Sequence, residues 1–151
     1  MIKIRNTNIK DIDTYFIWAN DDSVRELSFN SEKIPYQEHE TWFNNKLNDN
    51  NCFMFIFSIN IDIGQVRIQK VSNKDAIINI SIDKKFRGKG YGIQMLKMST
   101  DLFKNLFPEI IINAYIKIEN FASKSIFEKS GFTLVESLIY KNINSYHYII
   151  V

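Results

Sequence analysis

A basic, glycine-rich turn at residues 87–92 carries the clearest chemical signal in the sequence. Gly88, Gly90 and Gly92 are three of only five glycines in the chain, and Arg87 and Lys89 place two cations beside them. Glycine lets the backbone approach a ligand closely. A helix that starts at this turn adds free N–H donors and the positive end of its dipole. We therefore expect the turn to bind a phosphate group.

The two common nucleotide motifs do not fit this turn. A dinucleotide fingerprint needs a glycine three residues after Gly90, where the chain has Ile93. A P-loop needs Ser or Thr after Gly-Lys, and here Lys89 is followed by Gly90. A purely structural glycine turn is the remaining alternative to a phosphate site.

The elements that must position this turn follow from the hydrophobic pattern of the chain. Residues 1–151 form one predicted domain with the element order β-α-α-β-β-β-α-β-α-β-β. Hairpins followed by a strand–helix–strand crossover predict an α/β (α+β) fold, in which about four helices flank a mixed, mostly antiparallel twisted sheet of about seven strands. The expected strands cover residues 2–5, 52–59, 65–70, 76–83, 110–116, 132–140 and 143–151, and the helices 8–19, 37–47, 90–107 and 120–130.

Two local expectations concern the first helix and the first hairpin. Asn8 is placed to cap a helix that carries Ile9, Ile12 and Phe16 at helical spacing. One further turn of helix is expected at residues 23–27. Residues 61–64 end in Gly64 and are expected to form the hairpin turn that leads into the strand at 65–70.

Composition and charge limit the class of protein. With 151 residues, 45% of them hydrophobic and 14% aromatic, the chain can build a real core. A net charge of +2 does not indicate nucleic-acid binding. The single cysteine, Cys52, excludes an internal disulfide and a thiolate-cluster zinc site, and we expect no metal. Neither a signal sequence nor a membrane segment is apparent, so the sequence predicts a soluble cytoplasmic protein without a membrane partner.

Two segments of the chain resemble the signatures of one enzyme superfamily. Residues 87–92 match the Arg/Gln-x-x-Gly-x-Gly/Ala motif of the GNAT N-acetyltransferases, and residues 120–132 are similar to its second signature, an Asn-initiated helix that ends in Gly-Phe. The expected strand order resembles that of the family, so the resemblance covers nearly the whole chain. It implies acetyl-CoA as co-substrate and transfer of its acetyl group to a primary amine on a small acceptor.

The resemblance also implies roles for individual residues. Backbone N–H groups of residues 87–92 would hold the CoA pyrophosphate, residues 80–82 would pair with pantetheine, and the Ile82 N–H would polarise the thioester carbonyl. Asn120 would bond pantetheine or the attacking amine, and its alternative role is a plain N-cap. The implied CoA-binding residues are Ile80, Ser81, Ile82, Arg87, Gly88, Lys89, Gly90, Tyr91, Gly92, Asn120, Ser123, Lys124 and Phe127.

The chain departs from the family at the usual acid and base. Many members place a tyrosine seven residues after the asparagine, where this chain has Phe127, and many carry a glutamate on the strand before the glycine loop, where it has none. Tyr140 and Tyr146 are the alternative candidates for the acid, so the catalytic set becomes Ile82, Asn120, Tyr146 and Tyr140. Strand alternation puts Tyr146 and Tyr148 on one face and His147 on the other.

The acceptor is predicted by a narrower resemblance. The chain resembles GNAT domains of nonulosonic-acid pathways (pseudaminic or legionaminic type), which acetylate an amino group on a nucleotide-linked sugar. Arg25 and Arg67 would then meet a phosphate, with solvated surface charges as the alternative, and no acidic wall for a polyamine is evident. The predicted acceptor residues are Trp18, Arg25, Asn30, Ser31, His39, Gln65, Arg67 and Asn79.

Two other functions are left open by the sequence. A protein N-terminal or ribosomal-protein acetyltransferase of the same superfamily is the alternative within the enzyme class. A CoA-binding module that has lost catalysis is the alternative outside it, because Phe127 replaces the usual acid. The state of assembly is also open, with a homodimer as one alternative.

Overall fold

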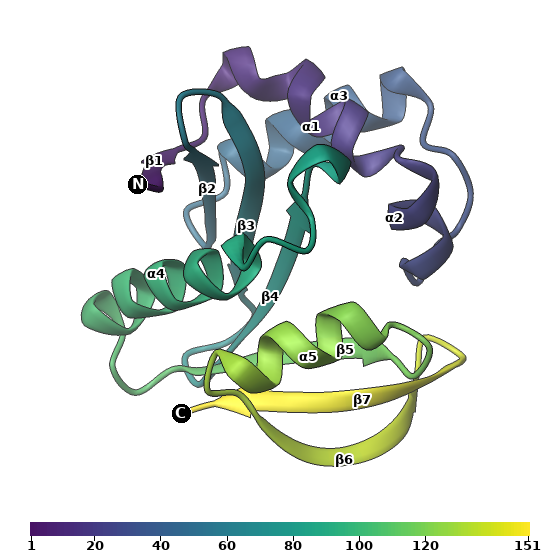
Figure 1. The fold of residues 1–151 in the computed structure, drawn as a ribbon. Coiled ribbons are helices and arrows are strands. Elements are labelled where there is room, and N and C mark those ends of the chain that lie inside the picture. The colour runs from purple at the N-terminus through teal and green to yellow at the C-terminus, as the bar shows by residue number, and fades with distance from the viewer.

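A single seven-stranded sheet organises the computed structural model, which describes all residues 1–151 (Figure 1). Its spatial order is β1-β2-β3-β4-β5-β7-β6, and β4–β5 is the one parallel pair. The expected mixed, mostly antiparallel sheet is therefore confirmed. The strands are β1 (Lys3–Asn6), β2 (Cys52–Ser58), β3 (Asp62–Lys70), β4 (Asp75–Ile82), β5 (Ile111–Lys117), β6 (Thr133–Tyr140) and β7 (Ile143–Ile150).

Five α-helices flank the sheet, one more than expected, because the anticipated single turn of helix is a helix of its own. Figure 1 shows the first three of them together at one end of the molecule, while α4 and α5 lie along the two halves of the sheet. Short 3₁₀ turns precede α1 and α4. The helices are α1 (Ile12–Ala19), α2 (Asp22–Leu27), α3 (Tyr36–Leu47), α4 (Tyr91–Leu106) and α5 (Phe121–Lys129), and the 3₁₀ turns are η1 (Ile9–Asp11) and η2 (Lys84–Phe86).

The first helix does not bury the apolar residues that recur at helical spacing from Ile9. Asn8 is an N-cap as predicted, but it caps the opening turn η1, in a capping box with Asp11, and not α1 itself. The buried residues, however, are Asp11, Tyr15 and Trp18, while Ile9 is 57% exposed. The chain begins as η1, with about 3.0 residues per turn instead of about 3.6, so the helical phase counted from Ile9 does not continue into α1.

Gly64 lies inside β3 and not in the hairpin turn, so that prediction was wrong. The turn falls between Ser58 and Asp62, where Asn60 takes a positive φ of 120°. At Gly64, a Cβ atom would stand 2.6 Å from Ser81 O and 2.7 Å from Met95 Cε. The glycine is needed because β3, β4 and α4 approach one another closely here.

The parallel strands β4 and β5 separate part-way along their length (Figure 1). Their register ends at Ile77 opposite Asn113. At this fork, Asn113 Nδ2 donates to Ala76 O (3.1 Å) and to Asp75 Oδ1 (3.0 Å), and Asn113 Oδ1 accepts from His147 Nε2 (2.7 Å). The buried Asn113 amide thus bonds the backbone carbonyl of Ala76 close to the point where the β4–β5 pairing ends.

Two hydrophobic clusters hold the layers together. The larger one includes Leu96 and Phe103 of α4 and Ile112 of β5, all fully buried between the sheet and its helices. The smaller one includes Tyr15 of α1 and Phe43 of α3 and lies against β2. No helix has both the length and the apolar character that a bilayer crossing requires.

Candidate active site

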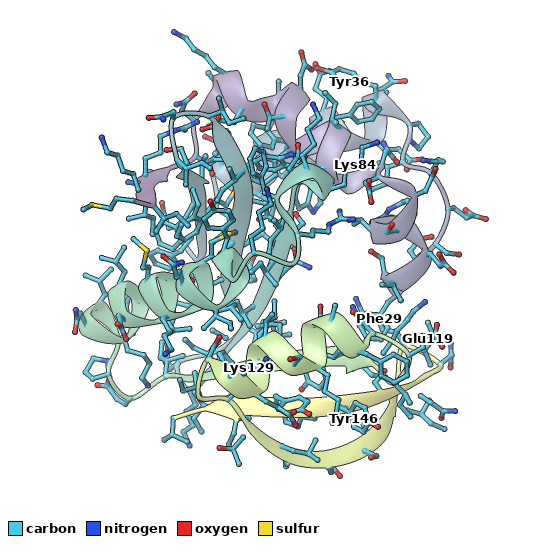
Figure 2. All side chains as sticks on the ribbon, in the orientation of Figure 1. Phe29, Tyr36, Lys84, Glu119, Lys129 and Tyr146 are labelled. Atoms are coloured by element: carbon cyan, nitrogen blue, oxygen red, sulfur yellow. The ribbon has the colours of Figure 1, made fainter.

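A cavity of about 840 Å³ occupies the fork between β4 and β5. Strands β3, β4 and β5 contribute to its walls, together with α1, α2 and α3 on one side and the start of α4 and the length of α5 on the other. Phe29, from the segment after α2, and Lys129, at the end of α5, both line it; Tyr146, at β7, does not (Figure 2). The cavity therefore has walls from both the N-terminal helices and α5.

Backbone groups of β4 are left unpaired along this fork. Asp83 N donates to Ile63 O, and Ile111 N donates to Lys74 O. Because bonding direction alternates along a strand, odd-numbered residues of β4 bond to β3, while Ile80 and Ile82 point their N–H groups to the β5 side. Since β5 has diverged there, Ile80 and Ile82 offer their peptide groups to the cavity. Ser81 instead faces β3, so its backbone is not placed for the pantetheine contact that the sequence predicted.

The glycine turn lies at the open end of this strand. Gly88 (φ 74°) and Gly90 (φ 84°) are left-handed, and Gly90 is the N-cap of α4. A Cβ at either position would meet no atom within 4 Å, so their surroundings are open. The predicted helix start at the turn is confirmed. A left-handed turn at a helix N-terminus directs backbone N–H groups outward, as an anion site requires.

Arg87 positions the turn with its side chain. Its Nε donates to Ile82 O (2.9 Å), and its Nη2 donates to Asp21 Oδ2 (3.2 Å). Burial alone would raise the pKa of Asp21, but bonds from the Val24 backbone N–H and from Arg87 outweigh it and lower the pKa below its ordinary value. The Arg87 side chain therefore ties β4 to the start of α2 and is not a free phosphate ligand.

The two predicted lysine contacts with CoA are not in the cavity. Lys89 Nζ lies 5.8 Å from the centre of the Phe86 ring and is absent from the lining. Lys124 Nζ lies 3.6 Å from Glu128 Oε2 and over the Tyr146 ring. Lys124 points to β7, away from the fork, because it pairs with the carboxylate one helical turn ahead on α5.

The start of α5 does reach the cavity. Asn120 Oδ1 accepts from Ser123 N (3.2 Å), which confirms the N-cap, and both residues line the cavity. Phe127 lines it too, although it is only 3% exposed, and its ring packs edge-on against Phe132 at 4.9 Å. Asn120, Ser123 and Phe127 thus line the same cavity as Gly88 and Gly90 of the glycine turn.

Neither candidate tyrosine lines the cavity. Tyr140 stacks on Tyr115 with ring centroids 4.0 Å apart, which places it behind a residue that does line the cavity. Tyr146 and Tyr148 share a face with rings 6.3 Å apart, and His147 stacks on Tyr115 from the other face, as alternation predicted. Tyr140 packs against Tyr115 of β5 and Tyr146 against Tyr148 of its own strand, so the structure places neither tyrosine in the cavity that Ile82 lines.

Polar side chains of β3 and β4 meet on the face of the sheet that carries α1 and α3. Gln65 Nε2 donates to Ser81 Oγ (2.9 Å) and to Asn79 Oδ1 (3.1 Å). Gln65 is only 5% exposed, and its Oε1 has no hydrogen-bond partner. Gln65 and Asn79, both predicted acceptor residues, are therefore brought together beside Ser81.

Arg67 follows Gln65 on the same face of β3 and lines the same cavity. Its guanidinium carbon lies 4.9 Å from the centre of the Trp42 ring. The Arg67 guanidinium forms no hydrogen bond and no ion pair with any other residue. Burial lowers its pKa. A half-buried guanidinium without a carboxylate partner leaves its N–H donors available to a ligand at the cavity wall.

Arg25 and Trp18 have structural contacts in place of the predicted acceptor contacts. Arg25 lines the cavity, but its guanidinium donates to Ala19 O (2.6 Å) and to Asn30 O (2.9 Å), which closes the segment after α2. Trp18 does not line the cavity, and its Nε1 donates to Asp83 Oδ2 (3.1 Å). Both side chains hold the N-terminal helices in place.

Of the remaining predicted acceptor residues, two lie outside the cavity lining and one borders the cavity. Asn30 and Ser31 are exposed and lie outside the cavity lining. His39 borders the cavity but is 1% exposed, and its Nε2 donates to Ile12 O (2.8 Å). These three positions were predicted from a polar loop and a helix, whose side-chain directions the sequence pattern left open.

Two cavity residues on β5 were missed by sequence reasoning. Tyr115 lines the cavity between the rings of Tyr140 and His147. Lys117 is 8% exposed, and its Nζ donates to Glu26 O (3.0 Å). Ala114 and Ile116 line the cavity as well, so a period-2 pattern would not have singled out Tyr115 and Lys117.

The charged groups that line the cavity are mostly cations. Their imbalance favours a negatively charged ligand over a positively charged one. The set consists of Arg25, Arg67, Arg87, Lys117 and Lys129, with Glu38 as the single carboxylate. No cluster of three or more His, Cys, Asp or Glu side chains is arranged to hold a metal ion.

The fork, the left-handed glycine turn and the two flanking helices define a CoA-dependent acyltransferase architecture. Residues 2–133 match the family model of the acetyltransferase (GNAT) domain, so the chain belongs to the GNAT acetyltransferases. It is an N-acetyltransferase with acetyl-CoA as donor. No curated protein sequence matches the chain.

Solved structures share the fold over nearly the whole chain. Spermidine N-acetyltransferase from Vibrio cholerae, solved with CoA and spermine, has a TM-score of 0.87 at 18% identity and covers 99% of this chain and 94% of its own. The aminoglycoside acetyltransferase AAC(6')-Ib with coenzyme A has a TM-score of 0.84 at 15% identity, with 99% and 94% coverage. A domain from Methanocaldococcus jannaschii has a TM-score of 0.84 at 20% identity, with 99% and 97% coverage. None of the three is described as a sugar-biosynthesis enzyme, so the likeness establishes the fold and leaves the acceptor open.

Proposed function

We propose that the protein acetylates a primary amine on a sugar that carries a phosphate, most simply a nucleotide-linked amino sugar. The observation that carries this proposal is Arg67, a cation at the cavity wall with no partner of its own. An acceptor with a phosphate would supply the missing anion, and guanidinium pairs with phosphate through two parallel hydrogen bonds.

The other end of the cavity supports acetyl-CoA as the donor in this reaction. The pyrophosphate of acetyl-CoA would lie against the backbone N–H groups of the turn at 87–92, and pantetheine would extend along the unpaired edge of β4. The Ile82 N–H would then donate to the thioester oxygen and stabilise the negative charge that develops on it. Asn120 and Ser123 border the same end of the cavity.

The transfer itself needs few side-chain groups. The neutral amine nitrogen attacks the thioester carbon, a C–N bond forms, and the C–S bond breaks with CoA leaving as a thiolate. The amine loses one proton to water in the cavity, and the thiolate takes up a proton from water. Because a thiolate is a good leaving group, positioning and the oxyanion contact carry most of the rate enhancement, and no tyrosine acid is required at Phe127.

A polycationic acceptor fits this cavity less well, although two enzymes of similar fold are named for spermidine and aminoglycosides. The four lining cations without a carboxylate partner would repel such a molecule, and only Glu38 would attract it. A protein N-terminus is not opposed by the same argument, because it carries only one charge. Peptide acceptors therefore belong among the outcomes of the test.

Thiol release from acetyl-CoA tests the proposal directly. The acceptors are a UDP-linked amino sugar, the same sugar as a methyl glycoside, spermidine, kanamycin and a short peptide with a free N-terminus. We expect the largest kcat/KM with the UDP-linked sugar and the smallest with the two polycations. A higher kcat/KM for spermidine, kanamycin or the peptide would overturn the assignment of the acceptor, and CoA binding without thiol release from any of them would indicate a non-catalytic module.

A further inference from the structure

We infer that Gln65 holds the attacking amine, with its Oε1 atom as the hydrogen-bond acceptor for an amine N–H. The side chain is 5% exposed, and Oε1 is the one buried side-chain oxygen or nitrogen in the structure that lacks a partner. A buried carbonyl oxygen without a donor costs free energy in the absence of a ligand. A donor supplied by the substrate removes that cost.

The direction of the side chain is fixed by its other end. Gln65 Nε2 donates to both Ser81 Oγ (2.9 Å) and Asn79 Oδ1 (3.1 Å). These bonds use both N–H groups of the amide, so the carbonyl oxygen is the one end of the side chain left without a partner, and Gln65 is among the residues that line the cavity. A side chain held in this way is pre-organised for a ligand donor.

The position of Gln65 relative to the thioester follows from the strand register. Gln65 lies directly opposite Ser81, and Ser81 shares a peptide group with the N–H of Ile82, the proposed oxyanion donor. The Ile82 N–H points along the sheet into the fork, while Gln65 lies on the face that carries α1 and α3. An amine approaching from that face would therefore meet Gln65 Oε1 as it reaches the thioester carbon.

An amide has the right chemistry for positioning an amine and the wrong chemistry for deprotonating it. The carbonyl oxygen accepts from either the charged or the neutral amine but takes up no proton near neutral pH. Gln65 is therefore a positioning residue that orients the nitrogen lone pair, and the proton leaves to water. The chain has no glutamate on β4, and this contact from β3 takes over the orienting part of a base's role.

Gln65 and Arg67 together also define a length for the acceptor. They lie two residues apart on one face of β3, a separation of roughly 7 Å along the strand. A hexose ring that carries an amine opposite its glycosidic phosphate spans a comparable length. This corollary rests on the proposed function, whereas the role of Gln65 toward the amine requires only the placement of the thioester beside Ile82.

Two CoA thioethers test the inference without knowledge of the acceptor. Carboxamidomethyl-CoA presents an amide NH2 just beyond the position of the thioester carbon, and acetonyl-CoA presents a methyl group of the same size there. Isothermal titration calorimetry compares both analogues on the wild type and on Gln65→Met. We expect the wild type to prefer the amide by about fivefold, and Gln65→Met to lose this preference while it binds acetonyl-CoA unchanged.

The outcomes separate the two proposals. An equal affinity of the wild type for both analogues, or a preference that survives in Gln65→Met, would overturn the role of Gln65 while the donor site stands. A Gln65→Met loss of affinity for both analogues alike would show a structural role only and would likewise overturn it. Failure of the wild type to bind either analogue would overturn the placement of the donor, and the role of Gln65 with it.

Discussion

Replacing Gly64 by alanine tests how the oxyanion contact is held in place. The new methyl group would stand 2.6 Å from Ser81 O, about 0.8 Å closer than the 3.4 Å at which ordinary contact begins, and 2.7 Å from Met95 Cε. Met95 Cε is the flexible end of a side chain and can move aside. Ser81 O is backbone, and it belongs to the same planar peptide group as the Ile82 N–H. The methyl group therefore shifts the proposed oxyanion donor directly.

The expected magnitudes follow from that displacement. Overpacking of this size costs about 1–3 kcal/mol of unfolding free energy. For a chain of this length it lowers Tm by roughly 2–4 °C per kcal/mol. A displacement approaching 1 Å in a reacting geometry lowers turnover by about 10- to 100-fold. We therefore expect a large loss of kcat with a modest loss of stability.

Steady-state thiol release and thermal unfolding measure the two effects on the same variant. Ile112→Val is the matched control, because it removes one methylene from a fully buried core position outside the cavity lining and costs about 1 kcal/mol. The control should retain wild-type kcat at temperatures well below its Tm. A Gly64→Ala enzyme that loses stability but keeps its kcat would refute the link between the Ser81–Ile82 peptide and catalysis.

Three further predictions concern the glycine turn, the tyrosines and a carboxylate. Gly90→Asp should weaken acetyl-CoA binding by about 100-fold in calorimetry relative to Gly90→Asn. Both residues tolerate the left-handed conformation, and only Asp repels phosphate. Equal affinities of the two variants would rule out a phosphate site at this turn. Tyr140→Phe and Tyr146→Phe should keep kcat within about twofold, because neither residue lines the cavity, and a loss of tenfold or more in either would identify an acid that the structure does not place there. The pKa of Asp21 is lowered on folding from its ordinary 3.8, so its contribution to stability is complete above about pH 3.8 and is lost as the pH falls through the folded-state value. Asp21→Asn should therefore destabilise the protein at pH 7 and match the wild type in the most acidic denaturation curves, whereas a constant difference at every pH would contradict the bond to Arg87.

The elements that could be predicted from the sequence are those with local signals. The glycine turn, the Asn120 cap and the strand from 76 to 83 each carry their signal within a few residues, and the structure has all three. The start of α4 at the turn was also predictable, because glycine is the residue that adopts a positive φ without strain. These features fix the donor end of the site.

The features that escaped prediction depend on contacts distant in sequence. The sequence pattern predicts a turn at Gly64, and only the position of β4 shows that the glycine is needed for close packing inside a strand. Arg25 was predicted as an acceptor ligand, and only the structure shows that its guanidinium closes the loop after α2. Asn113 forms the fork through groups that are more than 30 residues away, Ala76 and His147. The unpartnered Gln65 Oε1 likewise becomes visible only once Ser81 and Asn79 occupy the other end of the amide.

The measurement that tests the proposed function most directly is a comparison of KM for the UDP-linked amino sugar and its phosphate-free methyl glycoside, in the wild type and in Arg67→Met. A guanidinium bond to phosphate contributes about 1.5–3 kcal/mol, so the variant should raise KM for the UDP-linked sugar by about 10- to 100-fold. It should leave KM for the methyl glycoside and for acetyl-CoA unchanged. An equal rise for both sugars, or no rise for either, would contradict a phosphate-bearing acceptor at Arg67.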